Sequence, residues 1–293
     1  MDKHVIDLIE ERRSKLSKGQ KRIADYIIAH YDKAAFMTAS KLGISVGVSE
    51  STVVRFAIEL GYDGYPQLQK GLKELIRNRL TSVQRIEVLS DQIKSENVLE
   101  KTLDFDIDKI RRTHDETSHE TFDASVDALL RAKHIYIMGV RSSFYLAGFL
   151  NFYFHYLFDN VKLLNTSSVS EMYEQLLRIG EGDVFIAISF PRYSKSTVRA
   201  VKYAKDRGAT IVSITDSHTS PIAQNADHLV MARSDMISFV DSLVAPLSVI
   251  NALIVAVGLK KQVEVSKTFQ DLEHIWEEYH VYEKAEKSSD GDV

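Results

Sequence analysis

The stretch VFIAISFPRYSKST, residues 184–197, decides the fold class of the central part of the chain. Its first seven residues are apolar almost without a break and rich in β-branched and aromatic side chains, as in strands that a parallel sheet buries on both faces. A turn with Arg192, Tyr193 and Ser194 follows, and a helical pattern begins beyond it. The stretch therefore predicts a buried strand that ends in a hydroxyl-rich turn and leads into a helix.

Strand-like segments of the same kind recur on both sides of this stretch. They are HIYIMG (134–139), VKLL (161–164), TIVSIT (210–215) and HLVMA (228–232). Amphipathic segments fill the gaps between them, and such an alternation predicts an α/β fold with a doubly wound parallel sheet, an α/β/α sandwich. Ligands of these sheets bind outside the carboxyl ends of the strands.

Two of the predicted strand ends combine hydroxyl groups with arginine: GVRSS follows the first strand and SFPRYSKST ends the third. A helix N-terminus offers free backbone N–H groups, hydroxyl groups donate further hydrogen bonds, and arginine adds charge-assisted ones. We therefore expect the two loops to bind a small phosphorylated ligand, although serines that only cap the two helices are the alternative. The expected ligand-binding residues are Gly139, Arg141, Ser142, Ser143, Ser189, Arg192, Tyr193, Ser194 and Thr197.

Several other kinds of site are excluded or disfavoured. GVRSSF lacks the glycines of GxGxxG, and no GK pair followed by Ser or Thr occurs, so neither nucleotide fingerprint is present. The chain has no cysteine, which excludes disulfides and thiolate metal ligands. His114 and His119 lie in THDETSHE, which we interpret as a solvated loop between two helices. We expect neither a metal nor a cofactor.

The first 80 residues have helical periodicity without a convincing strand, and they contain TASKLGISVGVSESTVVRFAIELG, residues 38–61. In this segment Gly43 is small where a second helix must cross closely, Gly47 permits the positive φ of a tight turn, and Ser49 can cap the next helix. Apolar residues then recur at helical spacing toward a core. The spacing is similar to that of the helix-turn-helix of DNA-binding proteins, although alanine is more usual at position 43.

A helix-turn-helix places the N-terminal residues of its second helix against base edges in the major groove. Ser51, Thr52 and Arg55 lie opposite the expected core face, and with Ser49 they form our predicted DNA-binding set. The alternative is a plain helical hairpin with a solvated face. Residues 1–80 contain 14 Lys and Arg against 10 Asp and Glu, a net charge of +4, whereas the whole chain has −4, which favours contact between the head and a polyanion.

The organisation that we predict has three parts: a helix-turn-helix domain at 1–80, a helical linker at 81–121, and a body at 122–285 that ends in helices. No apolar run reaches the roughly 18 residues that span a bilayer, and the charged N-terminus lacks the apolar stretch of a signal peptide. We expect a cytoplasmic protein without a membrane partner.

VSESTVVRF and ISFPRYSKST together resemble the RpiR family of bacterial transcriptional regulators, which join a helix-turn-helix to a sugar isomerase (SIS) domain. The likeness to a SIS domain covers about residues 122–260. It implies that operator DNA binds the head and that a phosphosugar effector binds the body. Many SIS loops read SxSGxT: Ser189 matches the first serine, while Pro191, Arg192 and Ser194 replace the second serine, the glycine and the threonine. Ser168 and Glu171 resemble a loop that touches the sugar.

The alternative function is a sugar-phosphate isomerase or a related enzyme. Isomerisation needs a base, usually Glu or His, and Glu171, Glu174 and His155 are available without any feature that marks one of them. A DNA-binding head on a ligand-binding body favours a regulator. Because one head contacts few bases, we expect a homodimer or a dimer of dimers that reads a pseudo-palindromic operator.

Overall fold

The computed structural model describes residues 5–77, 97–166, 168–234 and 240–283. The described parts of 1–115, 190–194 and 233–245 form one compact unit, and those of 116–189, 195–232 and 246–293 form the other. The predicted linker lies partly outside the described residues, and the three-part division stays a prediction.

The head is a small helical bundle within the first unit. Its buried core includes Ile23, Ile27, Leu42, Phe56 and Leu72. The helices have these bounds: α1 Val5–Arg12, a 3-10 turn at Arg13–Lys15, α2 Lys18–Ala29, α3 Tyr31–Ala34, α4 Ala39–Val46, α5 Glu50–Glu59 and α6 Tyr65–Arg77. Ser17 and Gln20 form a reciprocal capping box at the start of α2, an arrangement that Ser and Gln three residues apart favour.

The described residues of the body form one parallel sheet of five strands in the order β2-β1-β3-β4-β5. The strands are β1 Ile135–Gly139, β2 Val161–Leu163, β3 Val184–Ile188, β4 Thr210–Thr215 and β5 His228–Met231. β1, β3 and most of β4 are buried, as the apolar runs in the sequence predict. The third strand is shorter than expected, because it ends at Ile188 and not at Phe190.

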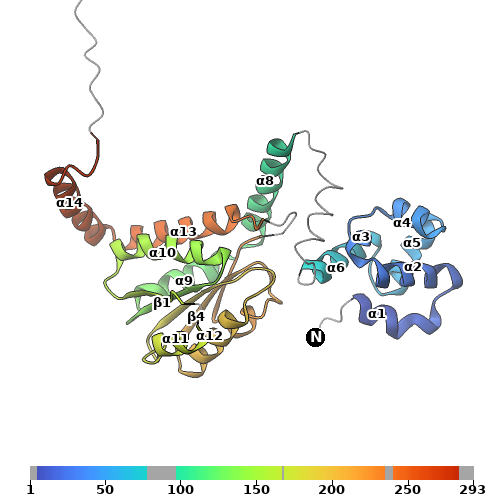
Figure 1. The fold of residues 1–293 in the computed structure, drawn as a ribbon, viewed down its shortest axis with the longest axis horizontal. Helices are drawn as coiled ribbons and strands as arrows, with labels where there is room; N and C mark the ends of the chain where they lie inside the picture. The colour runs from blue at the N-terminus through green and yellow to red at the C-terminus, as the bar shows by residue number, and fades with distance from the viewer. Residues whose placement is uncertain (1–4, 78–96, 167, 235–239, 284–293) are drawn as a thin grey trace, which may run out of the picture. The chain divides into compact units, whose positions relative to one another are not determined.

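Helices cover both faces of the sheet, which confirms the predicted sandwich (Figure 1). Phe185 and Ala187 pack with residues of α11 (Val169–Gln175) and α12 (Lys195–Asp206). The other face is covered by α9 (His119–Leu130), α10 (Ser142–Leu157) and α13 (Val244–Lys260). Along β3 the side chains alternate between the two layers, as the pleat of a strand requires.

The two helices that precede β1 in the chain differ from the predictions. The helix α8 runs through Val98–Glu116 and α9 begins at His119, so the interpretation of THDETSHE as a loop is wrong for all but two residues. Ser118 accepts a hydrogen bond from Thr121 N and caps α9, so the second helix begins inside the stretch interpreted as a loop.

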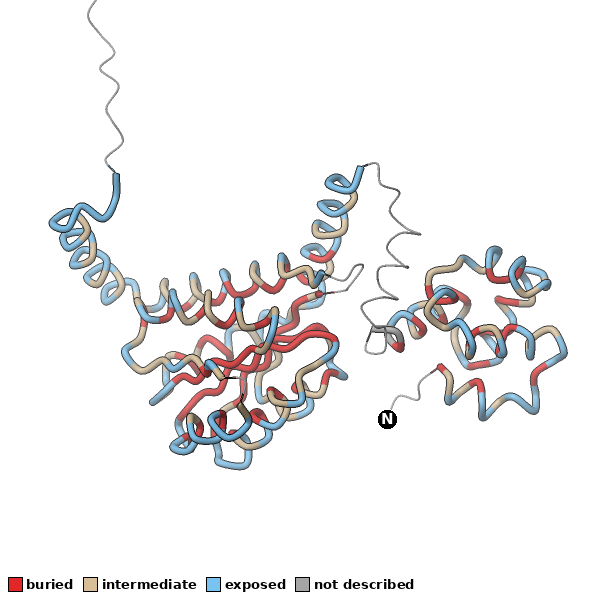
Figure 2. The backbone as a smooth tube through the Cα atoms, in the orientation of Figure 1, coloured by how far each residue is buried: buried red, intermediate tan, exposed pale blue. Residues whose placement is uncertain are grey.

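The apolar helix α13 is buried on one side only, since Val255 and Leu259 are exposed. α14 (Gln262–Glu278) has no buried residue, and Figure 2 shows it in exposed and intermediate colours along its length. No single described helix is long and apolar enough to cross a membrane; α13 and α14 would be so only as a pair, and they bend by 99° where they join.

Candidate functional sites

The turn of the helix-turn-helix is built around two glycines. Gly47 has φ +70° and ends α4 in the left-handed conformation, as its position in the sequence predicts. A Cβ on Gly43 would lie 2.8 Å from the carbonyl oxygen of Val48, which confirms that a small residue is needed where the segment before α5 crosses α4. The guanidinium of Arg22 donates a hydrogen bond of 2.8 Å to the carbonyl of Gly47 and fixes the turn against α2.

The second helix of this motif, α5, presents a polar face at its N-terminal end. Ser49 caps the helix by accepting a hydrogen bond from Thr52 N, and its hydroxyl lies 2.9 Å from that of Ser51 and 2.8 Å from that of Thr52. Ser51 and Arg55 are exposed, and the Nε of Arg55 donates to the carbonyl of Ser51. Thr52 is only half exposed, because its methyl group lies within reach of Gly19. The four predicted residues therefore lie together on one accessible surface.

In the body, the loop after β1 is closed tightly onto the first turn of α10. A Cβ on Gly139 would lie 2.2 Å from the carbonyl oxygen of Ser143, so only glycine fits where the strand ends. Arg141 precedes α10 with φ +60° and ψ −126°, a conformation that a non-glycine residue adopts at a cost. Ser143 is buried, and the side chain of Arg141 is exposed.

The loop after β3 shares that backbone feature. Arg192 has φ +66°, so an arginine in the left-handed region lies just ahead of the helix in both predicted ligand loops. Strained residues of this kind concentrate at functional sites, because the surrounding structure has to hold them in place.

A buried hydroxyl in the first turn of α12 is left without a partner. Thr197 is completely buried, and its Oγ1 has no hydrogen-bond partner. A buried hydroxyl without a hydrogen bond costs about 1–3 kcal/mol. Thr197 is one of the residues that the sequence assigned to the ligand site, and an external acceptor would satisfy it.

The strand register brings the two loops to neighbouring strand ends. Gly139, the last residue of β1, is the register partner of Ile188, the last residue of β3, and Ser189 follows directly. The order β2-β1-β3-β4-β5 reverses direction between β1 and β3, and ligands of open α/β sheets bind outside the carboxyl ends of the strands at such a switch point. Both predicted loops therefore start at the switch point.

The loop after β2 is bound largely to itself. Ser168 caps α11 by accepting from Glu171 N, and the carboxylate of Glu171 accepts a hydrogen bond from Thr166. These contacts give Ser168 and Glu171 structural roles, and their predicted contact with a sugar stays a prediction.

A third polar strand end was missed by the sequence reasoning. Thr215 ends β4 and Asp216 follows it; both are completely buried, and Thr215 Oγ1 donates a hydrogen bond of 2.7 Å to the carbonyl of Ser189. The signal was present in the sequence as TDSHTS, residues 215–220, directly after a strand. β4 adjoins β3, so Asp216 lies at the strand end next to the second ligand loop.

Comparison with protein families assigns both parts of the chain. Residues 3–79 match the family described as helix-turn-helix domain, rpiR family, and residues 128–256 match the SIS domain. The chain is an RpiR-family transcriptional regulator. This confirms the family that the sequence resembles, the order of its two domains and the predicted α/β fold.

Named relatives agree with this assignment. HexR, an HTH-type transcriptional regulator of Escherichia coli strain K12, is 25% identical over 226 residues, which cover 76% of this chain and 75% of HexR. The sugar isomerase domain of an RpiR transcription factor from Sphaerobacter thermophilus is 26% identical, with a TM-score of 0.59 over 61% of this chain and 99% of that one. Because the curated relatives are named as regulators, this RpiR-family chain is a regulator, and the isomerase alternative is not supported.

NanR of Vibrio vulnificus, solved in complex with ManNAc-6P, matches almost the whole chain. The match covers 92% of this chain and 97% of NanR, with a TM-score of 0.56. At 18% identity the likeness shows the fold alone.

Proposed function

We propose that this RpiR-family regulator binds operator DNA through α5 and that a phosphosugar, bound in the loops after β1 and β3, changes its affinity for the operator. The observation that carries the effector site is topological: the two loops rich in hydroxyl groups and arginine start at the switch point of the sheet. The strained backbone of Arg141 and Arg192 and the unpaired hydroxyl of Thr197 support it. NanR, a protein of the same fold, was solved with a phosphosugar.

On the DNA side, Ser51 and Arg55 would meet base edges and Ser49 and Thr52 the phosphates beside them. Their exposure and their place in the first turns of α5 support this assignment. The operator is pseudo-palindromic in this proposal, because two heads of a homodimer or of a dimer of dimers would bind two half-sites. We expect the regulator to act in the cytoplasm.

A panel of phosphosugars tested by thermal shift would identify the effector. Saturating ligand at 100 times its dissociation constant should stabilise the body by about 2.7 kcal/mol. Ser194→Ala should weaken binding of the phosphosugar about ten-fold, because a hydrogen bond to a charged group contributes roughly 1.5–3 kcal/mol. Ser266→Ala on the exposed face of α14 is the matched control. If Ser194→Ala weakened the phosphosugar and the unphosphorylated sugar equally, the phosphate assignment would be wrong.

The DNA site is tested on an operator selected from random-sequence DNA. Arg55→Ala should cost about 1–3 kcal/mol on the operator and much less on unrelated DNA. Arg55→Lys is the informative control, because lysine keeps the charge but loses the planar fork that pairs with guanine. If Arg55→Lys restored full operator affinity, Arg55 would be a phosphate contact and not a base contact.

A further inference from the structure

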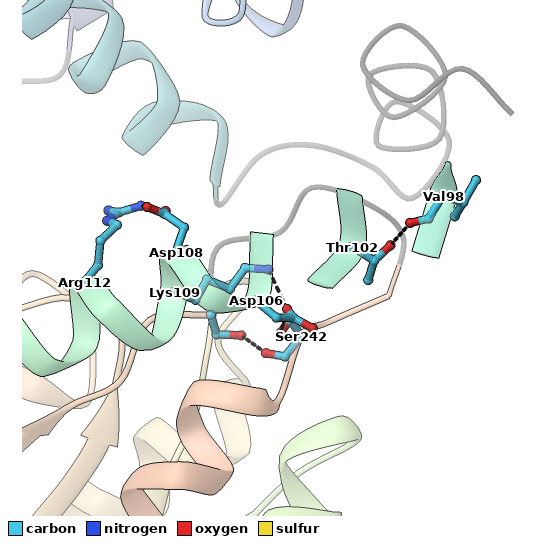
Figure 3. Close-up of polar contacts among 8 residues, drawn as sticks. Val98, Thr102, Asp106, Asp108, Lys109, Arg112 and Ser242 are labelled. Carbon is cyan, nitrogen blue, oxygen red and sulfur yellow. Dashed lines mark hydrogen bonds and ion pairs between the residues drawn. The ribbon is translucent and has the colours of Figure 1, made fainter. Parts of the chain in front are cut away.

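The helix α8 turns its polar side inward. Lys109 and Thr113 are buried, and the ammonium of Lys109 lies 3.2 Å from the carboxylate of Asp106 (Figure 3). The hydroxyl of Ser242 donates a hydrogen bond of 2.6 Å to the same carboxylate. Thr113 Oγ1 accepts a hydrogen bond of 2.8 Å from the backbone N–H of Arg233. Polar contacts to Arg233 and Ser242 therefore fix which side of α8 is covered.

The apolar side of the same helix is exposed. Leu99, Leu103, Ile107 and Ile110, which we call the α8 stripe, are 74%, 52%, 52% and 41% exposed. Their spacings of four, four and three residues place them on one face of a helix. Figure 2 shows the exposed colour recurring along the helix, which carries the label α8 in Figure 1.

This arrangement is the reverse of an ordinary amphipathic surface helix, whose apolar stripe faces the core. Rotating α8 to bury the stripe would break the hydrogen bond of Asp106 with Ser242 and that of Thr113 with the backbone of Arg233. A contiguous apolar surface that the fold does not cover marks an interaction site.

The charges beside the stripe identify the partner. Glu100 and Arg111 are both exposed and lie on the same flank of the stripe, near its two ends. If two copies of α8 pair in an antiparallel arrangement around a two-fold axis near residue 105, each Glu100 meets Arg111 of the partner subunit. A parallel pair around a two-fold axis would place the two copies of this flank on opposite sides of the seam, so Glu100 would not meet Arg111 of the partner subunit.

We propose that the α8 stripe packs, antiparallel, against the α8 stripe of a second copy of this chain. The proposal rests on the homodimer proposed above but not on its effector or its operator. Because four apolar side chains cover less than a stable interface needs, the pairing forms one part of a larger dimer contact. The paired surface lies on α8, the first described helix after the head.

Engineered disulfides test the geometry, and the absence of native cysteine makes them clean. In the antiparallel pair Leu103 lies beside Ile107 of the partner subunit, whereas two copies of Leu103 are offset by about 6 Å along the axis in addition to the distance between the helices. Leu103→Cys with Ile107→Cys should therefore form a disulfide-linked dimer on mild oxidation, and Leu103→Cys alone should not. The two cysteines cannot react within one chain, because side chains at i and i+4 have Cβ atoms about 5–6 Å apart.

Charge exchange tests the partner by an independent measurement on the full chain. Glu100→Arg or Arg111→Glu alone should raise the dissociation constant of the dimer about ten-fold, because two symmetry-related pairs become repulsive. The double exchange should restore it. Sedimentation equilibrium measures the dimer, and a far-ultraviolet circular dichroism melt shows that each variant is folded.

Every outcome decides the proposal. A cross-link in the double variant only, together with rescue by the double exchange, supports it. An equal cross-link with Leu103→Cys alone means a parallel pair and overturns it. A folded dimer without any cross-link means that another segment or another protein covers the stripe, which overturns this proposal but leaves the proposed dimer intact.

Discussion

Replacing Gly139 by alanine tests whether the loop after β1 requires glycine because the backbone of α10 approaches it closely. A general preference for glycine at strand ends would not produce the same loss of stability. The added Cβ would lie 2.2 Å from the carbonyl oxygen of Ser143 and 2.6 Å from its carbonyl carbon. Both atoms belong to the backbone of the first turn of α10, so no side-chain rotation can relieve the contact. The first turn has to move by about 0.8 Å merely to restore a separation of 3.0 Å.

The cost follows from what that movement disturbs. Overpacking a rigid site typically costs about 1–3 kcal/mol and sometimes more, and here α10 also packs on β1 and on β3. We therefore expect Gly139→Ala to destabilise the body by about 3 kcal/mol. For a domain of this size that is a drop of roughly 6–12 °C in the melting temperature of the body.

Differential scanning calorimetry of the full chain measures the shift, and Gly148 supplies the matched control. It lies inside α10, where an added Cβ meets nothing within 4 Å. Gly148→Ala should therefore stabilise the body by about 0.5–1 kcal/mol, because alanine has the higher helix propensity. If Gly139→Ala melted within a degree of the wild type while Gly148→Ala was stabilising, the close contact that we describe between β1 and α10 would be wrong.

Three further predictions concern the turn of the head, an ion pair of the body and the coupling of the two ligands. Arg22→Ala removes the donor to the carbonyl of Gly47 and should lower the stability of the head by about 1 kcal/mol in a denaturant titration, whereas an unchanged midpoint would show that the turn does not need it. Burial raises the pKa of Asp227, but hydrogen bonds from Lys205 and from the backbone N–H of Ile211 outweigh burial and hold the pKa below its usual range. A depressed pKa stabilises the fold at pH values above the unfolded pKa of about 4, and this contribution is lost as the pH falls further. The melting temperature of Asp227→Asn should therefore vary less between pH 5 and pH 2 than that of the wild type. Equal changes of melting temperature with pH in the two proteins would contradict this. Titration calorimetry on free and operator-bound protein should give phosphosugar affinities that differ by the same factor by which the sugar changes DNA affinity, and equal affinities would exclude coupling.

Most of the fold could be predicted from sequence because each element carries a local signal. Gly47 and Ser49 mark the end of one helix and the start of the next, and the structure confirms both. The apolar runs predicted the buried strands of a parallel sheet, since strands covered on both faces leave no polar alternation. The placement of the two predicted ligand loops at neighbouring strand ends followed from the same logic, as the carboxyl ends of parallel strands meet at one edge, and their binding of a ligand stays a prediction.

The remaining features depend on contacts between segments that are distant in the sequence. Nothing in GVRSS indicates that Arg141 takes a positive φ, because the turn conformation is imposed by the approach of Ser143 to Gly139. The position of Asp216 next to the loop after β3 depends on β4 lying beside β3, which the sequence alone does not state. The sequence predicted a helical linker at 81–121, but helical periodicity alone does not state whether the apolar side of α8 faces the core or the solvent.

The reversed orientation of α8 follows from a competition between two kinds of surface. The stripe would gain free energy from burial, at roughly 25 cal/mol for each Å² of apolar surface removed from water. The polar side, however, carries the Asp106 carboxylate and the Thr113 hydroxyl group, which accept hydrogen bonds from Ser242 and from the backbone N–H of Arg233, and a hydrogen bond to a charged group contributes about 1.5–3 kcal/mol. When the chain covers the polar side and a second copy covers the apolar side, the stripe is buried and the polar groups keep their partners. The opposite orientation would bury the stripe but lose the hydrogen bonds with Ser242 and Arg233. In the same unit Arg233, which follows β5, thereby contacts α8, the first described helix after the head. A ligand can change DNA affinity only through contacts that differ between two states of the protein. α8 has two surfaces at which such a difference can arise, its polar contacts on one side and the proposed two-fold pair on the other.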